Sequence, residues 1–246
     1  MRLLRDWLET NSTKSGSRVI LAADLLGPYT ERVERAAGLV KRLSGSVVAV
    51  KVNWHLLLPT GALGLKPLVE ACREADLPLI ADMKLNDIGS TNVEAADILF
   101  SNGFEALIAN PFAGRAEAIG EVIERAHAMG KAIVLLVYMS HAGAKEGYGL
   151  RVGGKPLYMR FAKSATEWGA DGVVVSAKSP AIIRQVRSAL GKKTVLMCPG
   201  VGAQGGDARL AVGAGADYVI VGRSIVGAAD PLKAVGELNR TLVAPR

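Results

Sequence analysis

The chain has 246 residues, half of them hydrophobic and 22% charged, which is the composition of a globular protein and not of a disordered one. Its two cysteines, Cys72 and Cys198, are too few for a disulfide framework or a four-thiolate zinc site, and they favour a reducing, cytoplasmic setting. The net charge of +7 is compatible with a nucleic-acid partner, but no block of five like charges occurs, so attraction of small anions is the better interpretation.

The N-terminal segment, Met1–Glu9, is interrupted by charges every few residues, so we expect no signal peptide. Its leucines and its tryptophan have the spacing of a short amphipathic helix at about residues 1–10. The longest apolar run of the chain, Ala132–Val137 with the two residues that follow it, is too short for a membrane span. We therefore expect no membrane partner.

Further along the chain, apolar segments of strand length alternate with segments of helical period. Val, Ile and Leu dominate the strand candidates, as in strands buried on both faces. These candidates are Arg18–Ala23, Ser46–Val50, Pro78–Ala81, Ala106–Ala109, Ala132–Val137, Gly172–Val175, Thr194–Cys198 and Tyr218–Val221. Helical spacing is clearest in three sets, which are Val33/Ala36/Ala37/Val40, Ala118/Val122/Ile123/Ala126 and Ile182/Ile183/Val186/Leu190. Asp230 and Pro231 are expected to begin the last helix, with the aspartate as its N-cap.

Eight such units without a break in composition predict an α/β fold, a single-domain (β/α)₈ TIM barrel over residues 1–246. An open doubly wound sheet is the alternative. The segment Tyr138–Lys155 carries five glycines and no clear period, and it follows the fifth strand. We expect it to be a functional or mobile loop at the barrel face where active sites lie.

Charged residues follow the first three predicted strands. Asp24 comes after the first, Lys51 after the second, and Asp82 with Lys84 after the third. Because strand side chains alternate, Asp82 and Lys84 are expected to point the same way, into the mouth of the barrel. Any one of these residues could be a solvated loop residue, but the set favours a site. Alternating signs of this kind can hold a lysine charged and placed as a proton donor.

A glycine-rich segment, Pro199–Asp207, follows the seventh strand and contains the pattern G-x-G-x-x-G. This pattern normally opens the first unit of a dinucleotide-binding fold, whereas only one strand remains here. In a barrel, the loops after the last two strands form the usual phosphate site. Gly222 and Arg223 follow the eighth strand, where glycine allows close backbone approach and arginine can bind phosphate oxygens in a fork. Simple turn geometry and a surface salt bridge are the plainer alternatives.

No metal site is expected, because the three histidines, His55, His127 and His141, lack the spacing of metal ligands. No P-loop pattern occurs either. We therefore expect no cofactor.

Together these motifs resemble the orotidine 5′-monophosphate decarboxylase family. Asp82–Ile88 is similar to its D-x-K-x-x-D-I signature, and Met139–Ala144 resembles its pyrimidine-loop motif. Pro199–Asp207 resembles its phosphate-gripping lid, and Gly222 with Arg223 its phosphate cup. The resemblance covers the chain from about residue 18 to 225, in the family's order.

The resemblance implies decarboxylation of orotidine 5′-monophosphate to UMP and CO₂ in pyrimidine biosynthesis, without a metal. Lys84 would donate a proton to C6 of the pyrimidine, and Asp82 would lie against the departing carboxylate. Lys51 and Asp24 would complete the charged network and bind ribose hydroxyls. Contacts with the base and the phosphate are implied for Ser140, Pro199, Gln204, Gly222 and Arg223.

The resemblance also implies a homodimer with shared active sites. Asp87, Ile88 and Thr91 would reach into the neighbouring subunit's site. Two positions depart from the family, since Gly89 and Ala142 stand where relatives often carry proline. Both departures concern loop conformation and not the chemistry.

Three other functions remain as alternatives. One is a Mg²⁺-dependent sugar-phosphate decarboxylase or lyase of the same suprafamily, which shares D-x-K-x-x-D and would lose its activity in EDTA. The second is a basic nucleic-acid-binding domain, which would show salt-dependent binding of DNA. The third is a barrel that binds UMP without catalysis.

Overall fold

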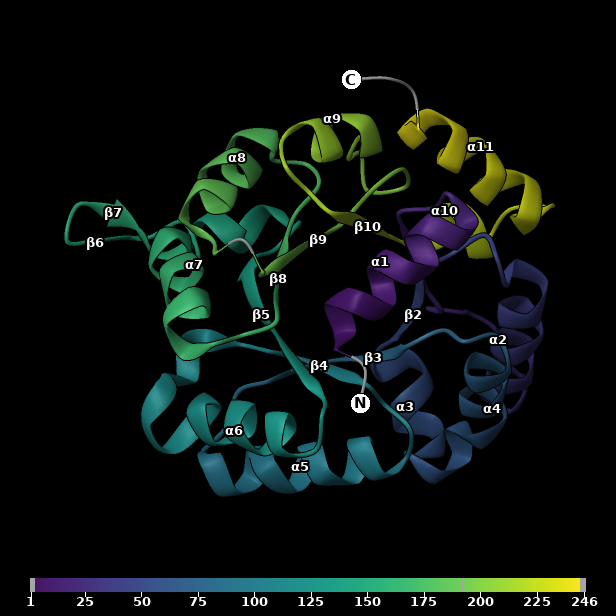
Figure 1. Cartoon of the computed structure of the whole chain (residues 1–246), viewed down its shortest axis with the longest axis horizontal. Coiled ribbons are helices and arrows are strands. Elements are labelled where there is room, and N and C mark those ends of the chain that lie inside the picture. Colours follow the sequence, from purple (N-terminus) through teal and green to yellow (C-terminus); the bar gives the residue numbers. More distant parts are fainter. Residues whose placement is uncertain (1–2, 192, 244–246) are drawn as a thin grey trace.

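The structure, a computed structural model, describes residues 3–191 and 193–243 (Figure 1). Within these residues, eight strands close into a parallel barrel with the neighbour order β1-β10-β9-β8-β5-β4-β3-β2. The predicted TIM barrel is therefore confirmed, and the open sheet is excluded. The barrel strands are β1 Val19–Ala22, β2 Ala49–Val52, β3 Leu79–Leu85, β4 Ala106–Ala109, β5 Ala132–Tyr138, β8 Gly172–Val175, β9 Val195–Pro199 and β10 Tyr218–Val221.

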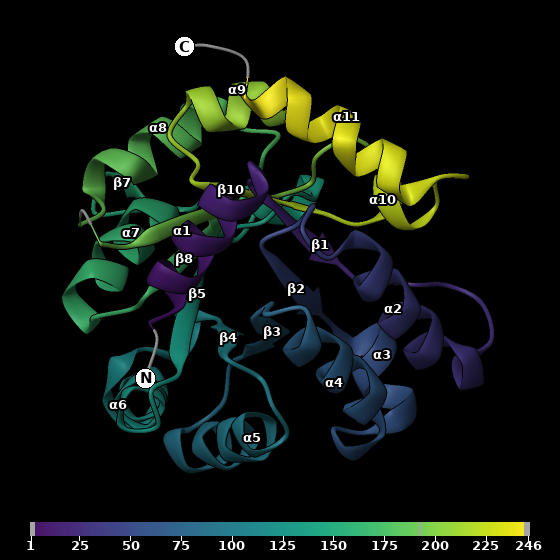
Figure 2. The ribbon, with the colours of Figure 1, turned by 45° about the vertical axis from the view of Figure 1, so that its right-hand side comes forward.

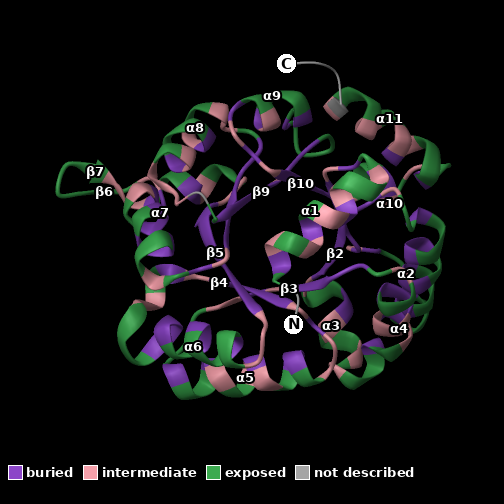
Figure 3. Cartoon of the chain, in the orientation of Figure 1, coloured by how far each residue is buried: buried purple, intermediate pink, exposed green. Residues whose placement is uncertain are grey.

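Helices surround the barrel, with their buried faces turned inward and their exposed faces in solvent (Figure 3). In chain order they are α1 Leu4–Ser15, α2 Tyr29–Leu43, α3 Trp54–Thr60, α4 Lys66–Glu74, α5 Gly89–Ser101, α6 Gly120–Ala128, α7 Leu157–Trp168, α8 Pro180–Ala189, α9 Ala208–Gly213, α10 Arg223–Val226 and α11 Pro231–Val243. Asp230 caps α11 as predicted, because its Oδ1 accepts hydrogen bonds from the amides of Leu232 and Lys233. None of the helices in the described part of the chain has the length and hydrophobicity needed to cross a membrane.

One end of the barrel is covered by α1, which crosses it in both ribbon views (Figures 1 and 2). The side-chain amide of Asn11 donates to the carbonyls of Val48 and Asp76, which precede β2 and β3, at 3.1 and 2.8 Å. Leu8 is fully buried beneath the helix. Since these contacts lie at the amino ends of the strands, the carboxyl ends form the opposite mouth. Of the helix expected at about 1–10, residues 1 and 2 lie outside the described part.

Two strands extend beyond their predicted ends by two residues or more, and both errors involve charged residues. Lys51 does not follow β2 but lies within it, paired with Ala22 of β1 and Ile80 of β3. Asp82 and Lys84 likewise lie within β3, which runs four residues beyond the predicted end at Ala81. Charged residues normally indicate that a buried strand has ended. Here the charges neutralise one another at the barrel mouth, so the strands continue through them.

Two predicted helical patterns extend beyond the observed helices, one at its start and one at its end. Ala118 lies in an irregular turn with non-helical backbone angles, and α6 begins only at Gly120. Leu190 follows the end of α8 in an extended conformation. Ala118 is buried and Leu190 packs against the core, each from outside the helix, so spacing alone assigned them to helices.

The glycine-rich segment after β5 has more order than the predicted loop. It contains a 3₁₀ turn, Ala142–Lys145, and a hairpin of β6 Arg151–Val152 with β7 Lys155–Pro156 that projects from the barrel (Figure 1). Gly153 and Gly154 connect the two short strands, and both have positive φ. A two-glycine connection of this kind is a recognised hairpin signal.

Candidate active site

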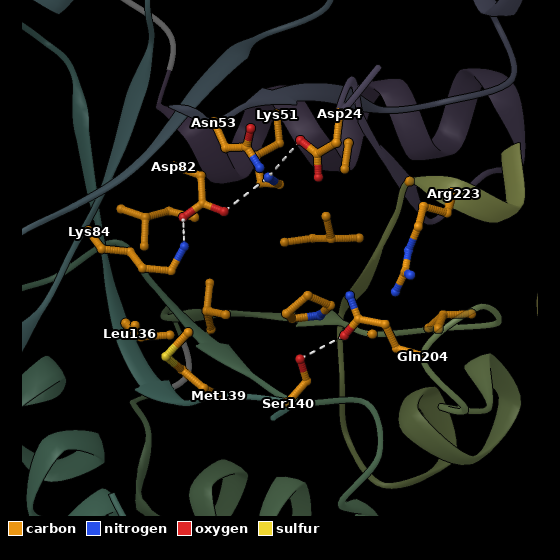
Figure 4. A pocket seen from close by; sticks show the side chains of 18 of the residues that line it. Asp24, Lys51, Asn53, Asp82, Lys84, Leu136, Met139, Ser140, Gln204 and Arg223 are labelled. Carbon is orange, nitrogen blue, oxygen red and sulfur yellow. Dashed lines mark hydrogen bonds and ion pairs between the residues drawn. The ribbon is translucent and has the colours of Figure 1, made fainter. Parts of the chain in front are cut away.

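A cavity of about 210 Å³ lies at the carboxyl mouth of the barrel (Figure 4). Its charged side is formed by residues of the first three strands and the loops after them. Its opposite side is formed by the loops after β5, β9 and β10. The predicted site residues that line it are Asp24, Lys51, Asp82, Lys84, Ser140, Pro199, Gln204, Gly222 and Arg223.

Four charges of alternating sign make up the charged side (Figure 4). The Lys51 ammonium lies 3.0 Å from Asp82 Oδ2 and 3.5 Å from Asp24 Oδ1. Lys84 Nζ donates to the other oxygen of Asp82 at 2.6 Å. The Lys51 side chain is only 5% exposed, so it depends on these carboxylates to remain charged in the interior.

The same contacts set the direction of two pKa shifts. Burial alone lowers the pKa of Lys51, but attraction to Asp82 and then to Asp24 outweighs it, so the pKa is raised. Burial alone raises the pKa of Asp82, but attraction to Lys51 and Lys84 outweighs it, so the pKa is lowered. Lys51 and Asp82 are therefore both ionised at neutral pH.

Lys84 reaches Asp82 through an unusual backbone conformation. Its φ is +53°, in the left-handed region that non-glycine residues rarely adopt and that costs about 1–3 kcal/mol. The register of β3 against β4 shifts over the same segment, between Ala81 and Leu85. Despite this irregular backbone, both Lys84 and Asp82 line the cavity, as the expected alternation predicts.

Asn53 also lines the cavity, although the sequence analysis did not select it. Its Oδ1 accepts a hydrogen bond from the amide of His55 at 2.9 Å and lies 2.6 Å from the His55 ring nitrogen Nδ1. The oxygen is thus held at the start of α3, and the amide nitrogen lies on the side of Lys51 (Figure 4). Its position two residues after Lys51 on the same strand face was the available signal.

The floor of the cavity is apolar. It is formed by Ile108, Leu136, Val174 and Ile220 from β4, β5, β8 and β10. These side chains are almost fully buried. They place apolar surface beside the charged groups, and a lower local dielectric strengthens the interactions of the most buried of these groups.

Glycines shape the loop after β9. Gly200, Gly202 and Gly205 all have positive φ, and the Gly206 amide donates to the Gly200 carbonyl at 2.9 Å. The turn presents Gln204, whose Oε1 accepts from the Ser140 hydroxyl at 2.7 Å. This hydrogen bond joins the loop after β5 to the loop after β9 on this side of the cavity, and the Arg223 guanidinium faces it (Figure 4).

Three predicted site residues lie outside the cavity. Asp87, Ile88 and Thr91 are exposed at the start of α5. Gly89, which departs from the family pattern, begins that helix, and a Cβ at this position would overlap the carboxylate of Glu121 from α6. The space that a proline ring would fill is therefore occupied by a side chain of the neighbouring helix.

Comparison with known proteins gives one consistent result. Residues 17–238 match the family described as "Orotidine 5'-phosphate decarboxylase / HUMPS family". A protein named orotidine 5′-phosphate decarboxylase from Thermococcus kodakarensis is 39% identical over 92% of this chain and 97% of its own length.

Solved structures agree with this match. The crystal structure of orotidine 5′-phosphate decarboxylase from Pyrococcus horikoshii has a TM-score of 0.78 and 33% identity over 92% of this chain and all of its own. The enzyme from Methanocaldococcus jannaschii, complexed with the inhibitor BMP, has a TM-score of 0.80 and 26% identity over 92% of this chain and 99% of its own.

The buried network predicts how stability depends on pH. Because the folded pKa of Asp82 is lowered, its contribution is present above the unfolded value of about 3.9 and is lost as the pH falls through the folded pKa. Asp82→Asn should cost about 3–5 kcal/mol of unfolding free energy at pH 7, since it leaves buried Lys51 with one partner fewer. The difference in unfolding free energy between the parent and Asp82→Asn, measured by denaturant unfolding, should become smaller below about pH 4.

Asp97→Asn is the matched control, because Asp97 forms an exposed pair with Arg125 on the outer surface. Loss of this exposed ion pair should change the unfolding free energy by about 1 kcal/mol or less. If the unfolding free energy lost by Asp82→Asn relative to the parent stayed constant from pH 7 to pH 3, the assigned charge state would be contradicted.

Proposed function

The chain belongs to the orotidine 5′-phosphate decarboxylase/HUMPS family, and on that basis we propose that it decarboxylates orotidine 5′-monophosphate to UMP and CO₂, a step of pyrimidine biosynthesis. The observation that carries the proposal is the alternating network of Asp24, Lys51, Asp82 and Lys84 at the mouth of the barrel. It places a charged lysine beside a carboxylate, with an apolar floor beneath.

The chemistry assigned to this network is loss of CO₂ followed by protonation. The bond from C6 to the carboxylate breaks, its electron pair stays on C6, and the Lys84 ammonium donates a proton there. The amine of Lys84 then regains a proton from solvent. A fixed cation beside the developing carbanion stabilises the transition state most strongly where water is excluded. Asp82 is assigned the place beside the departing carboxylate, where repulsion weakens as CO₂ forms.

The opposite side of the cavity is suited to the phosphate and the base. We assign Arg223 and Gln204 to the phosphate, together with the backbone at Pro199 and Gly222. Ser140 is assigned to the pyrimidine, and Asp24 with Lys51 to the ribose hydroxyls. Phosphate binding would hold the loops after β5 and β9 closed over the ring, so that binding energy at one end acts on the chemistry at the other.

We further propose that the enzyme is a homodimer in which Asp87, Ile88 and Thr91 complete the partner's site. In a single chain these residues are exposed and lie outside the cavity. Ile88 is 63% exposed, and Leu58 and Leu63 after the adjacent strand β2 are 72% and 82% exposed. Apolar side chains of this size at one end of a barrel indicate a surface that another copy covers.

Two further assignments belong to the proposal. The chain is taken as one domain, since every residue of the cavity comes from the same barrel. A cytoplasmic location is supported by the two buried cysteines, Cys72 and Cys198, which are free thiols.

The function is tested by following loss of orotidine 5′-monophosphate by absorbance, with UMP identified by chromatography. Turnover should persist in EDTA, whereas a Mg²⁺-dependent sugar-phosphate lyase would lose its activity. Lys84→Ala should abolish turnover, because it removes the proton source and leaves Asp82 with one cation fewer. Lys163→Ala is the control, since Lys163 is exposed and pairs with Glu167 on the outside of α7. A folded Lys84→Ala protein with near-normal turnover would refute the assignment.

Arg223→Ala tests the phosphate site. It should weaken binding of orotidine 5′-monophosphate and of UMP by about 1.5–3 kcal/mol, the value of a charge-assisted hydrogen bond. Calorimetry with uridine, which lacks the phosphate, should show almost no change. Arg184→Ala on the exposed face of α8 is the control. Equal losses for UMP and uridine would mean that Arg223 supports the structure and not the phosphate.

The shared site is tested by mixing two inactive proteins, Asp87→Asn and Lys84→Ala, through co-refolding. In each mixed dimer one site carries both changes and the other carries neither. Random pairing makes about half of the dimers mixed, so activity should return to roughly a quarter of the parent value. Mixed dimers without activity, once chromatography shows that they formed, would place Asp87 in its own subunit's site.

A further inference from the structure

We propose that Asn92 is a positioning residue, whose side chain fixes the backbone of Asp87 so that the Asp87 carboxylate can act in the partner subunit's site. The proposal rests on the shared site described above. It adds a residue that touches neither cavity nor interface, because Asn92 is only 1% exposed and does not line the cavity.

Asparagine at this place needs a physical reason. Asn92 lies in the first turns of α5, where its side chain competes with the helix backbone for hydrogen bonds and lowers helix propensity. A buried amide is also costly unless it is fully bonded. A small apolar residue would meet neither penalty, so the contacts of this side chain explain its presence.

Both ends of the amide bind the same residue. Asn92 Oδ1 accepts a hydrogen bond from the Asp87 amide at 3.2 Å, and Asn92 Nδ2 donates to the Asp87 carbonyl at 2.6 Å. We find no backbone partner for either Asp87 group among the described residues. The side chain of Asn92 therefore takes the place of secondary structure for a residue between a strand and a helix.

The two hydrogen bonds from the Asn92 side chain hold the backbone of Asp87 from both sides. The Asp87 carboxylate is held as well, because its Oδ1 accepts from the backbone amide of Ile88 at 2.7 Å. The backbone amide of Asn92 donates to the Ile88 carbonyl at 3.0 Å, so this arrangement belongs to the first turn of α5. Backbone and carboxylate are thus both restrained, while the side chain of Asp87 remains exposed.

Asn92→Ala should therefore reduce turnover without removing any cavity residue. Displacement of a catalytic group by about 1 Å costs up to 100-fold in rate, so we expect kcat to fall roughly 10- to 100-fold. The matched control is Asn11→Ala. Asn11 is also buried and also binds the backbone of another segment, but it lies at the closed end of the barrel. Both variants should lower the denaturation midpoint, and only Asn92→Ala should lower kcat.

The decisive measurement mixes Asn92→Ala with Lys84→Ala by co-refolding. If Asn92 acts through Asp87 in the partner's site, each mixed dimer again has one unaffected site, and activity should rise to roughly a quarter of the parent value. A purely structural defect, or one transmitted to Lys84 of the same chain, would give no such rise. Asn92→Ala and Lys84→Ala, each refolded alone, provide the baseline.

The outcomes separate the two proposals. Recovery with Asp87→Asn but not with Asn92→Ala would overturn the role of Asn92 and leave the shared site intact. Failure of both mixtures would overturn the shared site. Should Asn92→Ala not fold, Asn92→Asp replaces it, since it keeps the shape and the acceptor for the Asp87 amide but opposes the Asp87 carbonyl. Asn92→Asp should lower kcat, and mixing it with Lys84→Ala should restore activity as expected for Asn92→Ala. If this mixture showed no recovery, the proposal would be refuted.

Discussion

A single buried cation organises the active end of this barrel. The ammonium of Lys51 lies in the interior, where an isolated charge would cost far more than a folded domain can spare, and it is tolerated because two carboxylates flank it. That requirement fixes Asp24 after β1 and Asp82 within β3, on either side of β2. Asp82 then has a second oxygen free to hold Lys84. Lys84 is therefore placed by a chain of charges that begins with the buried ammonium of Lys51.

The two halves of the cavity come from the two halves of the chain. The first three strands supply the charges, and the segments after β5, β9 and β10 supply the hydroxyl, amide and guanidinium groups. The hydrogen bond between Ser140 and Gln204 is the link between loops on that second side. A nucleotide fits this division, since its reacting ring and its phosphate are chemically different ends of one molecule.

The sequence was sufficient to predict the closed barrel, because strands buried on both faces give unbroken apolar runs that spacing can recognise. It was less reliable where tertiary contacts override local patterns. Lys51 and Lys84 were placed just after the ends of their strands and not within them, since nothing local reveals that their charges are neutralised inside the strands. Asn53 could have been selected from the sequence, because it lies two residues after Lys51 and therefore on the same strand face. Asn92 carried none, because the backbone that it binds is defined only when the helix has docked.

The pairing of Gly89 with Glu121 links two neighbouring helices at the start of α5. The Glu121 carboxylate lies where a β-carbon at residue 89 would be, so a larger residue there requires this exposed, flexible side chain to turn away. The cost of such a substitution therefore depends on residue 121 as well as on residue 89. Shortening Glu121 would remove the overlap, so the effects of changes at the two positions are not expected to be additive.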